Sequence, residues 1–408
     1  MKIVHLILGK ARLDRANGVN RVAHNLATKQ AELGHEVEIW GITSNPNQFL
    51  AKRPYKLKLF QTNRNRFRVA KGIKSEISWL SRAAAMVHIH GCFIPEFSAV
   101  AKQLRKQGIP YVYSPHGGFS PGAIDRGGWK KRFYFQQFEK PLVLGAHALH
   151  FLGPIQFHAF DRWLPGAQKV IIPNGQNFEE LSWIPWPQDI HSERPIFSFC
   201  GRLSMEHKGL DLLLKGFARY CLEGGRGALW LIGDGEDRKP LTRLAKKLKV
   251  RERVTFHGSV FGEEKLNLLY HSDWFIHPSR YEGMPCSVLE AAGLGKPSII
   301  SEYTNLGSVI QKRDAGIVLP QLDVIELTNS FNKAERLYLA KEHHLMGIHA
   351  KQMVQEDFTW ESIAQRFVHL YQNDPSASPK MLHAPTPPEV NKQPASDQSS
   401  TSKPKIAS

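Results

Sequence analysis

Short apolar runs, rich in β-branched residues, alternate with helical patterns along most of the chain. In the front half, the apolar runs cover residues 3–8, 37–40, 87–89, 111–114, 148–152 and 170–172. Strands that alternate with helical segments are typical of βαβ units, which build parallel sheets. The front half is therefore predicted to be an α/β domain with a parallel sheet.

The back half repeats this pattern, with a glycine directly after each strand. Its apolar runs lie at 196–200, 229–232 and 254–257, and a helical pattern follows at 212–220. Between the halves, residues 183–187 are rich in Trp and Pro, which predicts a linker. A chain of 408 residues is long enough for two such domains.

The charge adds information because it is uneven. Residues 1–190 contain 26 Lys and Arg against 12 Asp and Glu, a net of +14, whereas residues 191–408 contain 28 against 25, a net of +3. A basic front half attracts an anionic partner such as a membrane surface, a lipid-linked diphosphate, an acidic polysaccharide or nucleic acid. The sequence contains no nucleic-acid recognition motif, so we expect no nucleic-acid partner.

Hydropathy and cysteine spacing argue against other classes of protein. Cys92, Cys200, Cys221 and Cys286 form no Cys-x-x-Cys pair, which argues against zinc or a disulfide framework and favours a reducing cytoplasm. No run of eighteen apolar residues exists, so no membrane-spanning helix is predicted. The apolar start of the chain is too short for a signal peptide and predicts a first buried strand.

Two segments of the front half combine basic and aromatic residues. In residues 52–82 the preferred interpretation is an amphipathic helix whose apolar stripe packs on the sheet, and a membrane-surface role for its basic face is the alternative. Residues 129–135 fit two interpretations equally: a packed helix with one solvated side, or a surface that faces an acceptor or lipid.

Two carboxylates frame the most informative stretch, residues 277–293. An apolar run at 274–276 precedes a loop with Glu282 and Pro285, and good helix formers follow, so the pattern predicts strand, tight loop and helix. The N–H groups at such a helix start favour a phosphate, and flanking carboxylates suit the hydroxyls of sugars. Alternatively, Glu282 and Glu290 are solvated surface charges.

Two cations, a histidine and a glycine stand in comparable places after other strands. Arg202 and Lys208 lie between a strand and a helix, where they suit a diphosphate, although a surface loop has similar composition. His116 follows the strand at 111–114, at the sheet edge where ligands bind, or it is a structural histidine. Gly18 permits a close approach of backbone to ligand at the start of a helical segment.

Residues 277–293 resemble the Glu-x7-Glu motif of the retaining glycosyltransferases of the GT-B fold, family four. In that family the first glutamate bonds the donor sugar, the second bonds the nucleotide ribose, and the amides between them hold the diphosphate. The resemblance gives these roles to Glu282, to Glu290, and to the backbone of Gly283, Met284, Pro285 and Cys286.

Further family motifs lie in the front half. Gly18 corresponds to a glycine-rich loop that faces the donor diphosphate, although Asn17 replaces the first of its two glycines. His116 stands where the family has a His-Gly or His-Asp pair, in the region of donor sugar and acceptor. Asn174 belongs to the family's Pro-Asn-Gly turn near the interdomain cleft.

In the back half, the resemblance makes Arg202 and Lys208 the expected phosphate ligands and places Val260 near the nucleobase. The catalytic residues it implies are His116, Arg202, Lys208 and Glu282. No Asp-x-Asp element stands out, and cations with helix-start amides can stabilise the leaving diphosphate, so neither a metal nor a cofactor is expected.

The resemblance covers roughly residues 1–372 and implies two Rossmann-like domains whose parallel sheets face each other across a cleft. The front domain is expected to hold the acceptor and the back domain the donor. The expected parts are an N-terminal domain (1–182), a linker (183–194), a C-terminal domain (195–356), a helix that crosses back to the first domain (357–372) and a disordered tail (373–408), whose composition is nearly free of apolar residues.

The implied reaction moves a hexosyl group from a nucleotide diphosphate sugar to a hydroxyl, with retention. The residues that flank His116 resemble those of transferases of bacterial exopolysaccharide or surface-glycan assembly. This resemblance favours a saccharide acceptor linked to polyprenyl diphosphate. The expected location is the cytoplasm, peripheral on the inner face of the membrane. The alternatives are an inactive GT-B subunit that binds sugar nucleotides and a GT-B epimerase.

Overall fold

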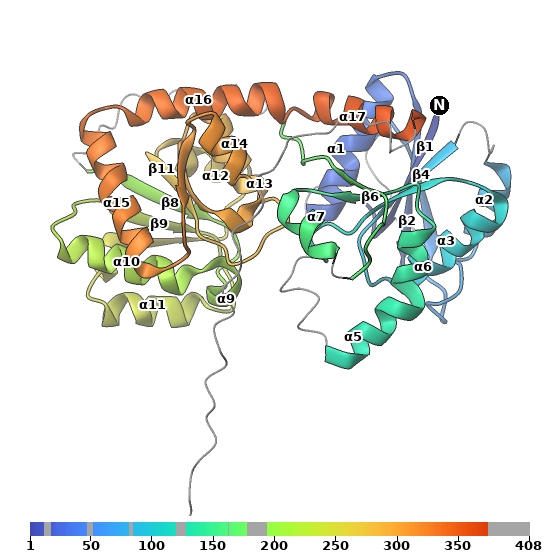
Figure 1. The fold of residues 1–408 in the computed structure, drawn as a ribbon, viewed down its shortest axis with the longest axis horizontal. Coiled ribbons are helices and arrows are strands. Elements are labelled where there is room, and N and C mark those ends of the chain that lie inside the picture. The colour runs from blue at the N-terminus through green and yellow to red at the C-terminus, as the bar shows by residue number, and fades with distance from the viewer. Residues whose placement is uncertain are drawn as a thin grey trace, which may run out of the picture.

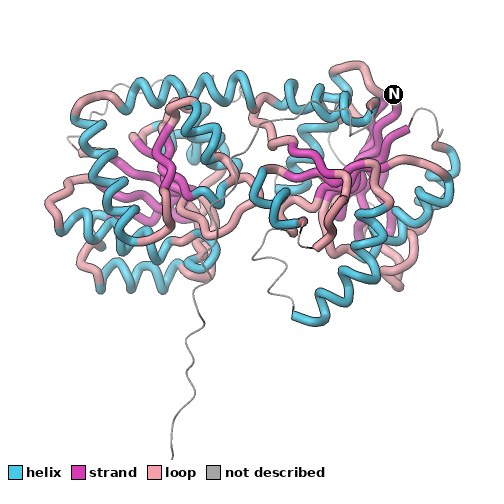
Figure 2. Tube along the Cα trace, in the orientation of Figure 1, coloured by secondary structure: helices cyan, strands magenta, loops and turns pink. Residues whose placement is uncertain are grey.

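The structure, a computed structural model, describes residues 1–11, 18–46, 52–80, 85–119, 128–161, 163–177 and 194–373. These residues form two α/β domains, each built on a parallel sheet with helices against it (Figure 1, Figure 2). The predicted fold class is confirmed. Asn17, most of the predicted linker and the predicted tail beyond Asn373 lie outside the described residues.

The sheet of the first domain has the strand order β3-β2-β1-β4-β5-β6-β7, and all of its neighbours pair in parallel. Its strands are β1 (Lys2–Leu8), β2 (Glu36–Thr43), β3 (Lys56–Gln61), β4 (Ala85–His90), β5 (Tyr111–Ser114), β6 (Ala148–Phe151) and β7 (Lys169–Ile171). Its helices are α1 (Gly18–Glu32), α2 (Ile73–Trp79), α3 (Pro95–Gln107), α5 (Gly128–Tyr134), α6 (Lys140–Leu144) and α7 (Pro154–Phe160), with a π-helical turn (Phe135–Glu139) between α5 and α6.

The sheet of the second domain has the order β10-β9-β8-β11-β12-β13 and is also parallel. Its strands are β8 (Ile196–Cys200), β9 (Ala228–Ile232), β10 (Val254–Gly258), β11 (Trp274–His277), β12 (Ser298–Ser301) and β13 (Gly316–Leu319). The helices are α9 (Met205–Lys208), α10 (Leu210–Leu222), α11 (Arg238–Lys247), α12 (Gly262–Tyr270), α13 (Cys286–Gly293), α14 (Gly307–Lys312), α15 (Val324–Leu339), α16 (His343–Asp357) and α17 (Trp360–Gln372), with 3-10 turns at Arg251–Arg253 and Glu302–Thr304.

The prediction of one amphipathic helix over residues 52–82 is wrong. The front part of this segment is the edge strand β3, and α2 is the only helix among its described residues. The sequence of β3 begins with Lys and Leu in alternation, a period of two that suits a strand. Lys58 bonds Glu38 on the neighbouring strand and Glu76 on α2 at 3.0 and 2.6 Å, so the basic residues lie on a charged sheet edge.

Both faces of the first sheet are buried. Ile3 and Ile7 of β1 pack into one apolar core, and Val4 and Leu6 pack into another on the opposite face, because successive side chains of a strand alternate. Strands covered on both faces consist of continuous apolar runs, which is why the sequence reveals them.

The end of the described chain returns from the second domain to the first. Helices α16 and α17 follow one another across both domains (Figure 1), and α17 packs on α1. Phe367 of α17 is buried in the same core as Ile3. The amide of Gln176 donates to the carbonyl of Phe358 at 2.6 Å, which bonds the crossover to the first domain. Within the described ranges, no helix is long and apolar enough to cross a membrane.

Candidate active site

The loop with the first predicted glutamate follows a central strand of the second sheet. Strand β11 lies between β8 and β12, and α13 begins directly after Pro285. Pro285 is the N-cap residue and has no side chain that can cap the helix. The first-turn amides of α13 therefore face the loop, and such an uncapped helix start favours an anion.

Glu282 lies among polar side chains and is nearly buried. Lys208 donates a hydrogen bond to its Oε1, Ser279 donates from Oγ at 3.1 Å, and His277 bonds the same oxygen through Nε2 at 3.2 Å. Only 11% of the Glu282 side chain is exposed. Glu282 is thus not the solvated surface charge that the sequence also allowed.

The charge state of this cluster follows from its neighbours. Burial acts to raise the pKa of Glu282, but the hydrogen bond from His277 and the charge of Lys208 outweigh it and hold that pKa well below its usual range. Burial, helped by the charge of Lys208, lowers the pKa of His277 to about 4. The pair is therefore a carboxylate and a neutral imidazole at neutral pH.

Backbone contacts lock the Lys208 loop onto the Glu282 loop. A Cβ on Gly209, whose φ is +67°, would lie 2.1 Å from the Pro278 carbonyl oxygen, so only glycine fits. The Arg280 guanidinium donates two hydrogen bonds to the Asp211 carboxylate, at 2.8 and 2.9 Å, and the backbone amide of Arg280 donates to the His207 carbonyl. Sequence reasoning missed Arg280, because a bidentate pair between distant loops has no local pattern.

Arg202 occupies the same loop but is exposed, and it forms no ion pair within the described part of the chain. Its charge is one of the smaller influences that lower the pKa of His207, of which burial is the largest. Arg202 therefore lies within the electrostatic range of this cluster.

Glu290 is the fifth residue of α13 and is 5% exposed. Lys265 of α12 binds its Oε2 at 2.8 Å, and Arg21 of α1 lies 3.8 Å from its Oε1. Arg21 comes from the first domain, so this ion pair connects the two domains. The surface-charge alternative does not hold for Glu290 either, and Arg21 was not predicted.

Loops at the carboxyl ends of both sheets meet at the Glu282 loop. A Cβ on Gly117 would lie 3.6 Å from the Cα of Gly283, so the loop after β5 touches the loop after β11. Asn305 donates to the carbonyls of Glu282 and Gly283 at 3.1 and 2.7 Å and accepts from the amide of Ile155 at 3.0 Å. The Glu282 loop is thereby held from both domains.

His116 stands directly before Gly117, in this contact zone. Its φ of 48° is in the left-handed region, which a side chain rarely adopts. The Nε2 atom of His116 hydrogen-bonds Nδ1 of His90 at 2.9 Å. Both interpretations of His116 therefore apply, since it is built into the domain and lies at the meeting point of the loops.

The remaining predicted residues occupy three different places. Gly18 begins α1, one turn before Arg21, and a Cβ there would meet nothing within 4 Å. Asn174 is buried beside the crossover, where the adjacent Gly175 packs on Trp360.

Val260 packs against the core that contains Met284, behind the helix that begins with Cys286. Among the described residues, neither Asn174 nor Val260 forms a hydrogen bond or ion pair with Glu282. The structure thus brings Lys208, Glu282, Gly283 and the His116 loop together, and links Glu290 to them through α13.

Both halves of the chain match known domain families. Residues 184–353 match the model for glycosyl transferases group 1, and residues 17–175 match the glycosyl transferase 4-like domain. An uncharacterized glycosyltransferase of Methanocaldococcus jannaschii, MJ1607, is 28% identical over 216 residues, which cover 51% of this chain and 54% of the relative. The putative glycosyltransferase EpsF of Bacillus subtilis is 29% identical over 247 residues, or 57% and 60% of the two chains.

The chain thus spans about half the length of the curated relatives it matches. Among solved structures, Anabaena HepE in complex with UDP is similar with a TM-score of 0.70 at 16% identity, over 90% of this chain and 99% of that one. Two Rossmann-like domains with parallel sheets, whose loops contact each other as described above, define the GT-B fold. The chain belongs to the group 1 glycosyltransferase family of that fold.

The buried Lys208–Glu282 pair predicts a stability effect with a defined pH dependence. Lys208→Met leaves a buried carboxylate without its cation, which costs roughly 3 kcal/mol of unfolding free energy at neutral pH. In the wild type, the lowered pKa of Glu282 contributes stability above the ordinary glutamate pKa that is lost as pH falls. In the variant the carboxyl can take up a proton, so the deficit shrinks in that same acidic range.

Denaturant unfolding across this pH range measures the effect, and Lys215→Met, on the exposed side of α10, is the matched control. A deficit that is absent, or equal at all pH values, would contradict the assigned pairing.

Proposed function

We propose that the protein is a retaining glycosyltransferase that moves a hexosyl group from a nucleotide diphosphate sugar to a hydroxyl of a saccharide acceptor. The observation that carries the proposal is the Lys208–Glu282 pair beside the uncapped start of α13. This arrangement offers a cation and amides to a diphosphate, and a carboxylate to sugar hydroxyls.

The leaving diphosphate gains negative charge as the glycosidic bond breaks. Lys208, Arg202 and the first-turn amides of α13 are proposed to stabilise this charge by electrostatic preorganisation. The ionised state of Glu282 suits acceptance of hydrogen bonds from the donor sugar, and Glu290 suits the ribose hydroxyls. Neither a metal nor a cofactor has a part in this proposal.

The relatives support a role in surface-polysaccharide or glycoconjugate synthesis. They include a lipopolysaccharide N-acetylglucosaminetransferase of Salmonella typhimurium, 26% identical over 59% of its length. We therefore propose a lipid-linked saccharide, such as one carried on polyprenyl diphosphate, as the acceptor. The proposed location is the cytoplasm, at the inner face of the membrane.

A donor screen tests the reaction. Calorimetry and slow hydrolysis are measured with UDP-, GDP- and ADP-sugars, and one nucleotide class is expected to bind and release sugar. Lys208→Ala should lower turnover roughly a hundredfold, because it weakens both binding and leaving-group stabilisation. Lys215→Ala keeps the wild-type rate.

The same screen separates the alternatives. Binding without hydrolysis or transfer indicates an inactive sugar-nucleotide subunit, and conversion of the sugar nucleotide to its epimer indicates an epimerase. Near-normal turnover of Lys208→Ala rejects the proposed phosphate contact.

Chelation tests the metal-independent mechanism. Since cations and amides of the protein are proposed to neutralise the diphosphate, turnover should be unchanged in excess chelator. Turnover that disappears with chelator and returns with Mg²⁺ or Mn²⁺ would show that this account of the leaving group is incorrect.

Membrane docking is proposed for α5, in which no residue is buried. Trp129 and Phe133 are 73% and 60% exposed, and Lys130 and Arg132 are exposed beside them. Phe135, the last residue of the basic and aromatic segment 129–135, cannot contact a membrane because it is fully buried. Exposed aromatics with cations suit the interface of an anionic bilayer.

Co-sedimentation measures this docking with vesicles that contain or lack anionic lipid, at low and high salt. Wild type should bind only anionic vesicles and dissociate at high salt, and Trp129→Ser with Phe133→Ser should weaken binding. Leu222→Ser, on an apolar residue of the second domain that is even more exposed, should not. Equal partitioning onto neutral vesicles, or none onto either, rejects the docking proposal.

A further inference from the structure

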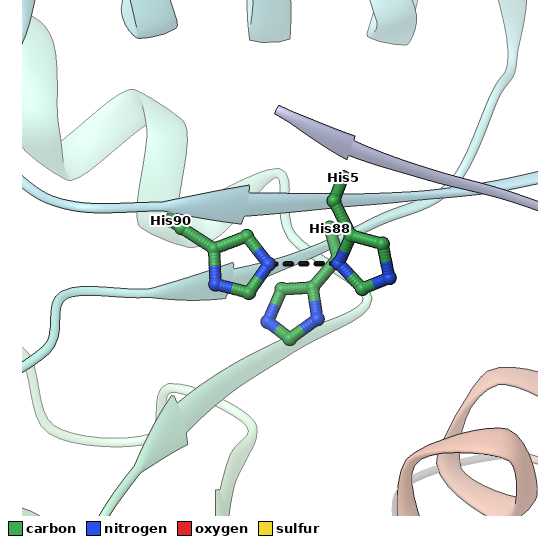
Figure 3. A group of neighbouring side chains, drawn as sticks. All are labelled: His5, His88 and His90. Carbon is green, nitrogen blue, oxygen red and sulfur yellow. Dashed lines mark hydrogen bonds between the residues drawn. The ribbon is translucent and has the colours of Figure 1, made fainter. Parts of the chain in front are cut away.

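The core of the first domain contains an unusual set of histidines. His5 of β1 and His88 and His90 of β4 lie together (Figure 3), and each is 0 or 1% exposed. His150 of β6 and His116 in the loop after β5 extend the set on both sides. Nothing in the proposed transfer reaction requires so many buried imidazoles behind the site.

A backbone carbonyl fixes the direction of the hydrogen bonds at one end. The Ile172 carbonyl can only accept, so His150 carries its proton on Nε2, 2.7 Å away. Nδ1 of His150 must then accept from the Ser114 hydroxyl at 2.6 Å, and Ser114 accepts from Nε2 of His88 at 2.5 Å. Nδ1 of His88 is left to accept from the Tyr371 hydroxyl, also at 2.6 Å.

Gln30 passes this direction on to the next histidine. Its Nε2 is buried and has no hydrogen-bond partner within distance among the described residues. Burial raises the pKa of the Tyr371 hydroxyl, and the Gln30 side chain acts against that rise, so the two side chains are neighbours. The Tyr371 proton is donated to His88, so Tyr371 has no proton left for Gln30, and the amide lies with Nε2 on the side of Tyr371. Its Oε1 then faces Nε2 of His5 at 2.7 Å.

The chain ends at the candidate active site. His5 donates from Nε2 to Gln30, so its Nδ1 accepts from Nε2 of His90 at 2.9 Å, the bond drawn in Figure 3. Nδ1 of His90 in turn accepts from Nε2 of His116 at 2.9 Å. Within the described chain no hydrogen bond reaches Nδ1 of His116, and that residue is partly exposed.

Electrostatics supports neutral rings throughout. Burial lowers the pKa of His5 and of His150 to about 4, and desolvation together with His150 lowers that of His116 to about 3. The pKa values of His88 and His90 also lie well below the usual range, first through burial and then through neighbouring imidazoles. A neutral imidazole carries one proton, so each ring has one donor and one acceptor.

A metal ion on His5, His88 and His90 is the competing use of this cluster, since ligand atoms of the three lie within 4.8 Å of one another. However, both ring nitrogens of each of the three already have a partner. The rings of His88 and His90 are also stacked at 4.0 Å, so their lone pairs run side by side instead of converging. The oriented hydrogen-bond chain accounts for more of the contacts.

We propose that this chain holds the proton of His116 on Nε2 and presents its Nδ1 to the substrate as a hydrogen-bond acceptor. His5, His90 and Gln30 are then positioning residues that act through His116. The proposal deepens the transfer function proposed above, since it names the chemistry of one substrate contact. The group that meets Nδ1 is a hydroxyl or an amide N–H, because a carboxylate or carbonyl has no proton to donate.

The protonation state of His116 can be observed directly without any substrate. Long-range proton–nitrogen correlation spectra of the full chain with isotope-labelled histidine distinguish a protonated from an unprotonated ring nitrogen, and His116→Gln assigns the signals. We expect Nε2 protonated and Nδ1 unprotonated at neutral pH. A proton on Nδ1 of His116 overturns the proposal, as does a stoichiometric metal ion found by elemental analysis of the purified protein.

Two variants test whether the chain is the cause. Gln30→Met removes the acceptor for His5, and a buried N–H without a partner is rarer than a buried lone pair, so His5 should move its proton to Nδ1 and reverse the chain. His116 should then shift toward the Nδ1-protonated form. Tyr371→Phe frees the Gln30 amide to turn and should give both tautomers.

Tyr111→Phe is the matched control, because it removes another buried hydroxyl of the same sheet whose bond goes to the Leu142 carbonyl. Its His116 signals should equal those of the wild type. Unchanged His116 signals in folded Gln30→Met and Tyr371→Phe overturn the proposal, and if neither variant folds, the wild-type tautomer alone decides it.

The substrate contact is tested with the donor that the screen identifies, as a series in which single hydroxyls are replaced by fluorine. Fluorine cannot donate a hydrogen bond, so replacement of the hydroxyl that contacts His116 should lower kcat/KM about tenfold. In Gln30→Met the same replacement should cost less. If every position loses the same in both proteins, His116 does not contact a donor hydroxyl, and the substrate part of the proposal falls. Failure of transfer itself leaves the tautomer measurement intact.

Discussion

The site depends on one buried carboxylate. Glu282 keeps its charge only because Lys208 and His277 supply hydrogen bonds and positive potential that outweigh its desolvation. A charge in such a place requires its partners to be held still. The surrounding contacts do this: Arg280 fastens the Lys208 loop through Asp211, and the absence of a side chain at Gly209 lets the two loops touch.

The same requirement extends across the domain boundary. Asn305 joins the carbonyls of the Glu282 loop to the start of α7, and α17 returns to the first domain and packs on α1. Tyr371 on α17 also belongs to the histidine chain that ends at His116. Helix α17 therefore both connects the second domain to the first and supplies one hydrogen bond of the histidine chain on the first-domain side.

The sequence predicted the parts of this arrangement that have local patterns. Buried parallel strands such as β1 appear as apolar runs, and the strand–loop–helix unit around Glu282 is marked by Pro285 and the helix formers after it. Pairings between distant segments have no such pattern, so Arg21 and Arg280 were missed. The edge strand β3 was missed because its basic and apolar residues were interpreted as the two faces of one amphipathic helix over residues 52–82.

Most of the net charge of the chain lies apart from the cations that are proposed to bind the diphosphate. The front half holds most of the net charge, +14 of +17, yet Lys208 and Arg202, the cations proposed for the diphosphate, belong to the back half. Arg21 is the first-domain cation that an ion pair places at the site, whereas His116 is neutral. The basic surplus of the first domain therefore lies apart from the proposed diphosphate contacts, and it favours the anionic partner proposed above. The exposed face of α5, which joins aromatic and basic residues, is where that partner fits the chemistry.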